Sequence, residues 1–135
     1  MVSHHAAQYS PYVLTALRVA TGFMFWQHGI QKFGFLGGEP REFLELRWFA
    51  AVLETFGGPL ISLGIFTRPL SFLLSGEMAS AYFISHNPRG LWPILNNGEA
   101  SYMFCFLFLY LVTVGPGKFS LDGWIASRFG PRWWM

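Results

Sequence analysis

The chain has 135 residues, of which 53% are apolar and only 12% are Asp, Glu, Lys or Arg. Soluble domains have about 25% charged residues, so this composition excludes an ordinary water-soluble globule and predicts a membrane protein. A net charge of +2 without any run of Lys or Arg excludes nucleic acid as a partner, and a single cysteine, Cys105, excludes an intrachain disulfide or a Cys-x-x-Cys redox pair.

Four apolar segments approach the length of about 20 residues that a bilayer-spanning helix needs. In chain order they cover about 12–33, 49–66, 69–85 and 100–117. The short break at Thr67-Arg68-Pro69 makes the second and third helices antiparallel neighbours. The expected fold class is therefore all-α, an antiparallel four-helix transmembrane bundle that forms one domain over residues 1–135.

The connections carry further expectations. The mixed-charge residues 39–47 are expected to form a short surface helix, and residues 118–135, which end in Trp133-Trp134-Met135, an interfacial tail. Four spans put both termini and the Arg68 turn on one side. That side holds Arg68, Lys118, Arg128 and Arg132, and the other holds Arg41, Arg47 and Arg89. The positive-inside rule then predicts a multi-pass protein of the cell inner membrane with cytoplasmic termini.

Three of the predicted spans contain charged residues. A charge in hydrocarbon costs about 2.5 to 3.5 kcal/mol, so these groups should face the bundle interior and find partners. Arg18, His28 and Lys32 recur at helical spacings and share one face of the first helix. Depth along the helices then predicts the pairs. Arg18 should pair with Glu77, and Glu54 with His28 or Lys32.

Two interpretations of these charges stay open. In one, the pairs only fix which helices are neighbours and in which register. In the other, they line a polar cavity that binds a small molecule, a quinone headgroup or protons. The candidate cavity residues are Arg18, His28, Lys32, Glu54, Glu77, His86 and Glu99.

Haem and metal are further alternatives for the same region. A haem would lie between His28 and His86, and a metal ion would need His28, Glu54, His86 and Glu99. Haem is not expected, because His86 falls at the end of its helix and on the face opposite Glu77. A metal ion is not expected, because its candidate ligands include no close-spaced pair such as His-x-x-x-His. Small residues at Gly22, Gly29 and Gly57-Gly58 allow helices to approach closely, within one chain or between copies in a homo-oligomer.

Several motifs are shared with a known family. They are Leu17-Arg18, His28-Gly29-Ile30-Gln31-Lys32-Phe33, Glu54-x-x-Gly57-Gly58, Leu63-Gly64-Ile65-Phe66-Thr67-Arg68-Pro69, Glu77-Met78, His86, Asn96-Asn97-Gly98-Glu99 and Gly115-Pro116-Gly117-Lys118-Phe119-Ser120-Leu121-Asp122. With these motifs the sequence resembles the DoxX family, within the wider DoxD-like group, over most of its length. The resemblance implies a small integral membrane protein.

The resemblance also implies a link to redox chemistry. Family relatives include subunits of a thiosulfate:quinone oxidoreductase and a mycobacterial membrane protein assembled with superoxide dismutase and a sulfurtransferase. The expected function is therefore a membrane subunit whose cavity binds a quinone or small sulfur species, with electrons or substrate supplied by a soluble redox partner. A non-enzymatic scaffold or assembly factor is the alternative. A small-solute or proton transporter is a third, which would need an oligomer because four helices enclose little space.

Overall fold

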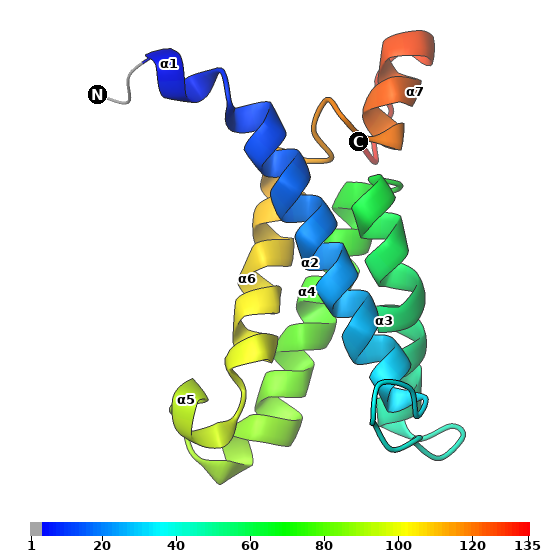
Figure 1. The fold of residues 1–135 in the computed structure, drawn as a ribbon, viewed down its shortest axis with the longest axis vertical. Coiled ribbons are helices and arrows are strands. Elements are labelled where there is room, and N and C mark those ends of the chain that lie inside the picture. Colours follow the sequence, from blue (N-terminus) through cyan, green and yellow to red (C-terminus); the bar gives the residue numbers. More distant parts are fainter. Residues whose placement is uncertain (1–3) are drawn as a thin grey trace.

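A computed structural model describes residues 4–135 of the chain, and the regular secondary structure of this part is entirely helical (Figure 1). The all-α expectation is therefore confirmed. The long helices are α2 (Ser10–Lys32), α3 (Leu46–Leu63), α4 (Thr67–Ala81) and α6 (Glu99–Val114). The shorter elements are α1 (His4–Ala7), the π-helical turn η1 (Tyr82–His86), the 3-10 turn η2 (Asn87–Arg89), α5 (Pro93–Asn96) and α7 (Leu121–Phe129).

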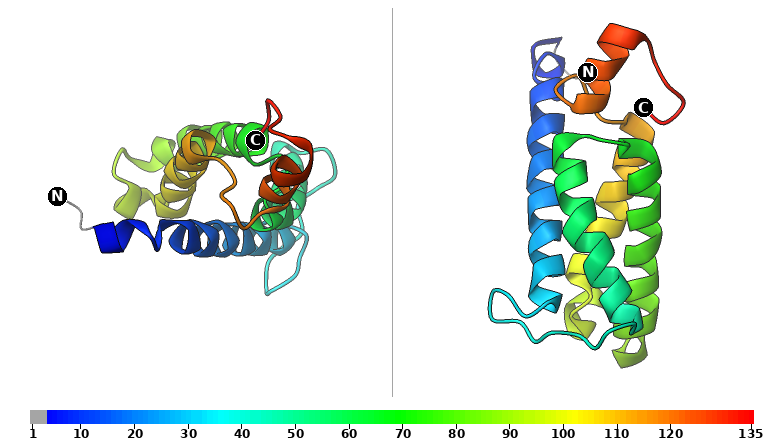
Figure 2. Two further views of the ribbon diagram at one scale, coloured as in Figure 1. Left: turned by 90° about the horizontal axis from the view of Figure 1, so that it is seen from above. Right: turned by 90° about the vertical axis from the view of Figure 1, so that its right-hand side faces the viewer.

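The long helices alternate in direction and form two hairpins. α2 packs most extensively against α3, and α4 against α6, whereas the contacts between the two hairpins are fewer. The start of α2, the α3–α4 connection and α7 lie together at what we call the terminal end, and the other connections lie at the opposite loop end (Figures 1 and 2). Among residues 4–135, no helix combines the length and the apolar character needed to cross a membrane.

The helix boundaries differ from the expected ones at three places. The break between α3 and α4 lies at residues 64–66, where Gly64 and Phe66 adopt left-handed backbone angles, and Thr67-Arg68-Pro69 forms the first turn of α4. Proline is tolerated there because first-turn amides have no partner within the helix. The third helix changes to π geometry after Ala81. The separate surface helix expected over residues 39–47 is wrong, because residues 39–42 are irregular, residues 43–44 form a turn and α3 begins at Leu46.

Glycines let α2 and α3 pack closely, and we call this contact, made by Gly22, Gly29 and Gly58, the glycine seam. A Cβ atom placed on Gly58 would lie 2.5 Å from the carbonyl oxygen of Gly22 and 2.7 Å from the backbone nitrogen of Trp26. A Cβ on Gly29 would likewise meet the backbone and side chain of Thr55. These glycines therefore allow the close packing of α2 against α3 within the chain.

The segment after α6 is tied to the terminal end by a buried carboxylate. Asp122 is only 1% exposed, and its oxygens accept hydrogen bonds from the backbone amides of Phe66 at 3.1 Å and Thr67 at 2.9 Å, and from the Thr67 hydroxyl at 3.2 Å. The carboxylate therefore caps the start of α4 from a position far along the chain. The expected interfacial tail thus includes a helix, α7, that is anchored to the bundle.

An Asp122→Ala variant should lose about 2 kcal/mol of unfolding free energy, because it leaves buried amides of α4 without an acceptor. Asp122→Asn keeps one acceptor oxygen and should lose less. Thermal unfolding of both variants in the same detergent would measure the difference. Equal stability of Asp122→Ala and the parent chain would show that the cap contributes nothing.

Candidate functional site

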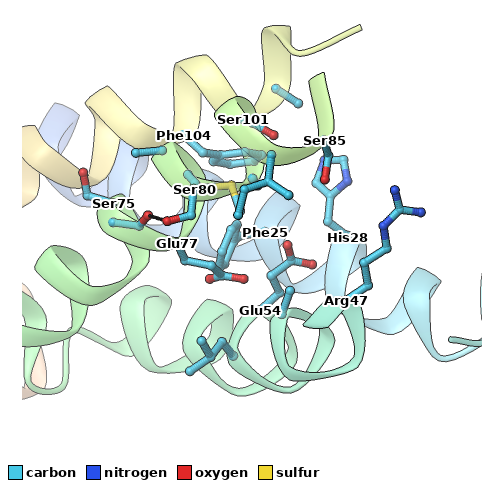
Figure 3. A pocket seen from close by; sticks show the side chains of 18 of the residues that line it. Phe25, His28, Arg47, Glu54, Ser75, Glu77, Ser80, Ser85, Ser101 and Phe104 are labelled. Carbon is cyan, nitrogen blue, oxygen red and sulfur yellow. Dashed lines mark hydrogen bonds between the residues drawn. The ribbon is translucent and has the colours of Figure 1, made fainter. Parts of the chain in front are cut away.

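A cavity of about 970 Å³ lies between the two helical hairpins, toward the loop end (Figure 3). Its lining comes from α2, α3, α4, η1 and α6 and from the connections near them. The cavity includes five of the seven candidate residues predicted from the sequence. These are His28, Lys32, Glu54, Glu77 and His86.

Glu54 of α3 forms one part of the cavity floor. Its side chain is 2% exposed, and one carboxylate oxygen, Oε1, accepts a hydrogen bond from the ammonium group of Lys32 on α2. The predicted pairing of Glu54 with His28 or Lys32 is thus confirmed, with Lys32 as the partner. The other oxygen, Oε2, is buried and has no hydrogen-bond partner in the described part of the chain.

Glu77 of α4 forms the rest of the floor. Both of its carboxylate oxygens are buried and lack a hydrogen-bond partner among residues 4–135. Figure 3 shows the carboxylates of Glu77 and Glu54 near one another, with the ring of Phe25 beside them. We call Glu54 and Glu77 the acidic floor. Buried polar atoms are nearly always hydrogen-bonded in folded proteins, so three unpartnered oxygens in one cavity require an explanation.

Aromatic rings form the wall above the acidic floor. Phe25 of α2 packs edge-on against Phe104 of α6, with ring centroids 5.3 Å apart, and the imidazole of His28 packs edge-on against the same Phe104 at 5.6 Å. Phe25 and Phe104 are buried, and all three side chains line the cavity. The wall therefore offers flat apolar surface to a ring-shaped ligand.

Three arginines surround the opening of the cavity. Arg41, Arg47 and Arg89 are exposed and come from the α2–α3 connection, the start of α3 and η2. We call them the basic mouth. Next to Arg89, the Nδ1 atom of His86 lies 3.2 Å from the guanidinium and 3.1 Å from the carbonyl oxygen of Asn96. The mouth is therefore positively charged, whereas the floor is acidic.

The buried side-chain amide of Asn96 connects several segments of the loop end by hydrogen bonds. Asn96 is fully buried, and its side chain donates to the carbonyl oxygen of Gly90 at 2.7 Å and to the Tyr82 hydroxyl at 3.3 Å, and accepts from the amide of Gly98 at 2.7 Å. Tyr82 begins the π-helical turn η1, which also carries His86. Single π turns within helices are frequent at functional sites.

The predicted pair of Arg18 with Glu77 is wrong. Arg18 is 1% exposed and donates instead to three carbonyl oxygens, that of Ile61 at 2.8 Å, that of Ser62, and that of Phe119 at 2.7 Å. Ile61 and Ser62 belong to the last turn of α3, where carbonyl oxygens have no partner within the helix and carry partial negative charge. The guanidinium is thus satisfied by backbone carbonyl oxygens at the terminal end, and Arg18 does not line the cavity that contains Glu77.

Glu99 also lies outside the cavity, exposed in the first turn of α6. The four residues considered for a metal ion, His28, Glu54, His86 and Glu99, are thus not gathered at one site. In the described residues, no three His, Cys, Asp or Glu side chains are grouped closely enough to hold a metal ion.

Sequence reasoning gave no structural role to the basic mouth, to Asn96 or to Asp122, although Asn96 and Asp122 lie in the motifs quoted above. The three arginines had no distinguishing signal, because nothing in the sequence indicates that the α2–α3 connection, the start of α3 and η2 meet at one opening. For Asp122 a nearby signal existed in Ser120, a residue type that favours the N-cap of a helix. Ser120 does cap α7, accepting a hydrogen bond from the amide of Gly123 at 2.9 Å, and Asp122 lies in the first turn of this helix.

Comparison with known proteins places this geometry in context. The sequence profile of the DoxX family matches residues 13–87. A protein of Haemophilus influenzae named "Uncharacterized protein" is 39% identical over 123 residues, which cover 85% of this chain and 92% of that protein. "Putative oxidoreductase CatD" of Bacillus subtilis is 27% identical over 115 residues, or 81% of this chain and 84% of that protein. No solved structure is detectably similar to the chain.

Proposed function

Since the chain belongs to the DoxX family, we propose that it is a redox-associated subunit of the inner membrane. In this proposal its central cavity binds a quinone headgroup or a small sulfur species. A soluble partner supplies electrons or substrate. The similarity to a protein named as an oxidoreductase supports the redox assignment.

The distribution of polar and apolar side chains supports a membrane location. Arg18 and Glu54, which reduce the hydropathy of α2 and α3, are buried within the bundle. Large apolar side chains on all four long helices are exposed instead, among them Phe23, Phe56, Phe72 and Phe106. A surface of this kind would be costly in water but is compatible with lipid.

The unpartnered acidic floor is the observation that carries the cavity proposal. A glutamate that served only to hold helices together would be paired, as the Oε1 atom of Glu54 is with Lys32. The second oxygen of Glu54 and both oxygens of Glu77 have no such partner and line a cavity large enough for a drug-sized molecule. A bound ligand would satisfy these oxygens.

The test is to identify the small molecule that accompanies the protein. The full chain should be recovered from washed membranes, purified in mild detergent, and analysed by mass spectrometry together with its ultraviolet and visible absorption. We expect a quinone-type or sulfur-containing molecule in stoichiometric amount, and its loss from Glu77→Gln. Glu99→Gln makes the same chemical change outside the cavity and should retain the ligand.

Two results would contradict the proposal. Recovery of the chain outside the membrane fraction would contradict the membrane location. Phospholipid as the sole bound molecule, unchanged in Glu77→Gln, would contradict the cavity function. The second result would favour the alternative of a non-enzymatic scaffold, in which the buried charges only set helix packing.

A further inference from the structure

The two ends of the bundle differ in the sign of their charges. The segments that meet at the terminal end, residues 4–17, 64–69 and 115–135, contain a single acidic residue, Asp122. That carboxylate is 1% exposed and is used by the amides at the start of α4, so it does not neutralise the surface. At the loop end, exposed glutamates accompany the basic mouth, namely Glu39, Glu42, Glu45 and Glu99. The terminal end is therefore the more uniformly basic of the two.

Three exposed cations in the segment after α6 each lie over an aromatic ring. The pairs, with the distance from the charged group to the ring centroid, are Lys118 with Phe119 at 5.0 Å, Arg128 with Trp124 at 5.5 Å and Arg132 with Trp134 at 5.7 Å. We call these three pairs the basic collar. Attraction between a cation and the face of a ring favours this arrangement.

The cations of the basic collar keep their capacity to bind an anion. Among residues 4–135, the sole ion pair joins Lys32 to Glu54, so no carboxylate of this part of the chain neutralises the collar. A guanidinium that stacks on a ring still presents its in-plane N–H groups, and an ammonium group has three donors. Phosphate oxygens are well suited to accept such charge-assisted hydrogen bonds.

The position of the collar fits the headgroup layer of a bilayer. Figures 1 and 2 show α7 beyond the ends of the four long helices, so in the proposed membrane location it lies outside the hydrocarbon. Exposed Tyr9 and Tyr12 lie near the start of α2, and the Tyr12 ring is 5.1 Å from that of Phe119. Tyrosine and tryptophan are enriched where lipid meets water. The terminal end therefore combines interfacial aromatic rings with unneutralised cations.

We infer that the basic collar binds the headgroups of anionic phospholipids of the phosphatidylglycerol class. The cations donate to the phosphate oxygens, and the rings beneath them lie among the headgroups. A zwitterionic lipid such as phosphatidylcholine carries its own cation, which the collar repels. The inference rests on the membrane location in the proposed function and is independent of the ligand in the cavity.

The test measures which lipid stays with the protein. The full chain, purified in mild detergent, is mixed with equal amounts of phosphatidylglycerol and phosphatidylcholine that have the same acyl chains, and the lipid retained after gel filtration is quantified by mass spectrometry. We expect phosphatidylglycerol to be retained at least about fivefold over phosphatidylcholine, which corresponds to about 1 kcal/mol for one cation near an anionic lipid. Added salt should reduce this preference.

Variants of the collar should remove the preference. Changing Lys118, Arg128 and Arg132 together to glutamine removes three exposed charges, so the fold should be kept and the retention of the two lipids should become equal. A charge-conserving triple variant, Lys118→Arg with Arg128→Lys and Arg132→Lys, should keep most of the preference.

The basic mouth provides the matched control. Changing Arg41, Arg47 and Arg89 together to glutamine removes the same number of charges at the loop end, and this variant should prefer phosphatidylglycerol as strongly as the parent chain does. Loss of the preference in the collar variant alone supports the inference. Equal losses in the two glutamine variants would overturn it, because total charge would then be sufficient.

The remaining outcomes separate the inference from the proposed function. Equal retention of both lipids by a parent chain that is recovered in the membrane fraction would overturn the inference and leave the membrane location and the cavity unaffected. Recovery of the chain outside the membrane fraction would overturn the membrane location and, with it, the inference.

Discussion

A Lys32→Met variant is expected to lose about 3 to 5 kcal/mol of unfolding free energy. The reason is the burial of Glu54, which is 2% exposed and whose only hydrogen-bond partner among residues 4–135 is Lys32. Removing the ammonium group leaves a negative charge inside the bundle without compensation. Thermal or denaturant unfolding in a fixed detergent, followed by circular dichroism, would measure the loss.

The matched control removes both charges. Lys32→Met combined with Glu54→Leu replaces the pair by apolar side chains of similar size, and such replacements of buried pairs are often neutral or stabilising. The double variant should therefore recover most of the stability that Lys32→Met loses. If the double variant is no more stable than the single one, the loss comes from the packing of the Lys32 side chain and not from its charge.

A Gly58→Ala variant should be destabilised by about 2 kcal/mol or more. The added methyl group would lie 2.5 Å from the Gly22 carbonyl oxygen and 2.7 Å from the backbone nitrogen and Cβ of Trp26. Because two of these three atoms belong to the backbone of α2, the helices must move apart to accept it. The same unfolding measurement applies, and the far-ultraviolet spectrum should remain helical.

Gly76→Ala is the matched control for this change. Gly76 also lies within a helix, α4, but a Cβ atom added there would have no neighbour within 4 Å. Alanine favours a helix interior over glycine by about 0.5 to 1 kcal/mol, so this variant should be as stable as the parent or more stable. Similar losses in both variants would contradict a specific seam between α2 and α3.

The sequence predicted the long helices well because their signal is local. Each predicted span overlaps one of α2, α3, α4 and α6, and the errors lie at the ends. The end of α4 is one example, since a change from α to π geometry after Ala81 leaves hydropathy unaltered. The turn before α4 is another, because Phe66 adopts a left-handed conformation that its residue type does not favour.

Depth along the helix axis was a good guide to one charge pair and a poor guide to the other. It brought Lys32 to Glu54 because both lie on facing sides of the tightly packed α2 and α3. The depth argument failed for Arg18 because it considered only charged side chains as partners and left out backbone carbonyl oxygens. The carbonyl oxygens at the end of α3 and of Phe119 could only be identified once the fold had placed them around the guanidinium.

The division into two hairpins also sets an order of assembly as the chain is synthesised. α2 and α3 emerge first, and the glycine seam and the Lys32–Glu54 pair can form before α4 exists. Glu77, Phe104 and the cap at Asp122 arrive later. Until then the cavity has one wall and half of its acidic floor. The complete cavity can therefore form only once α4 and α6 have been added to the first hairpin.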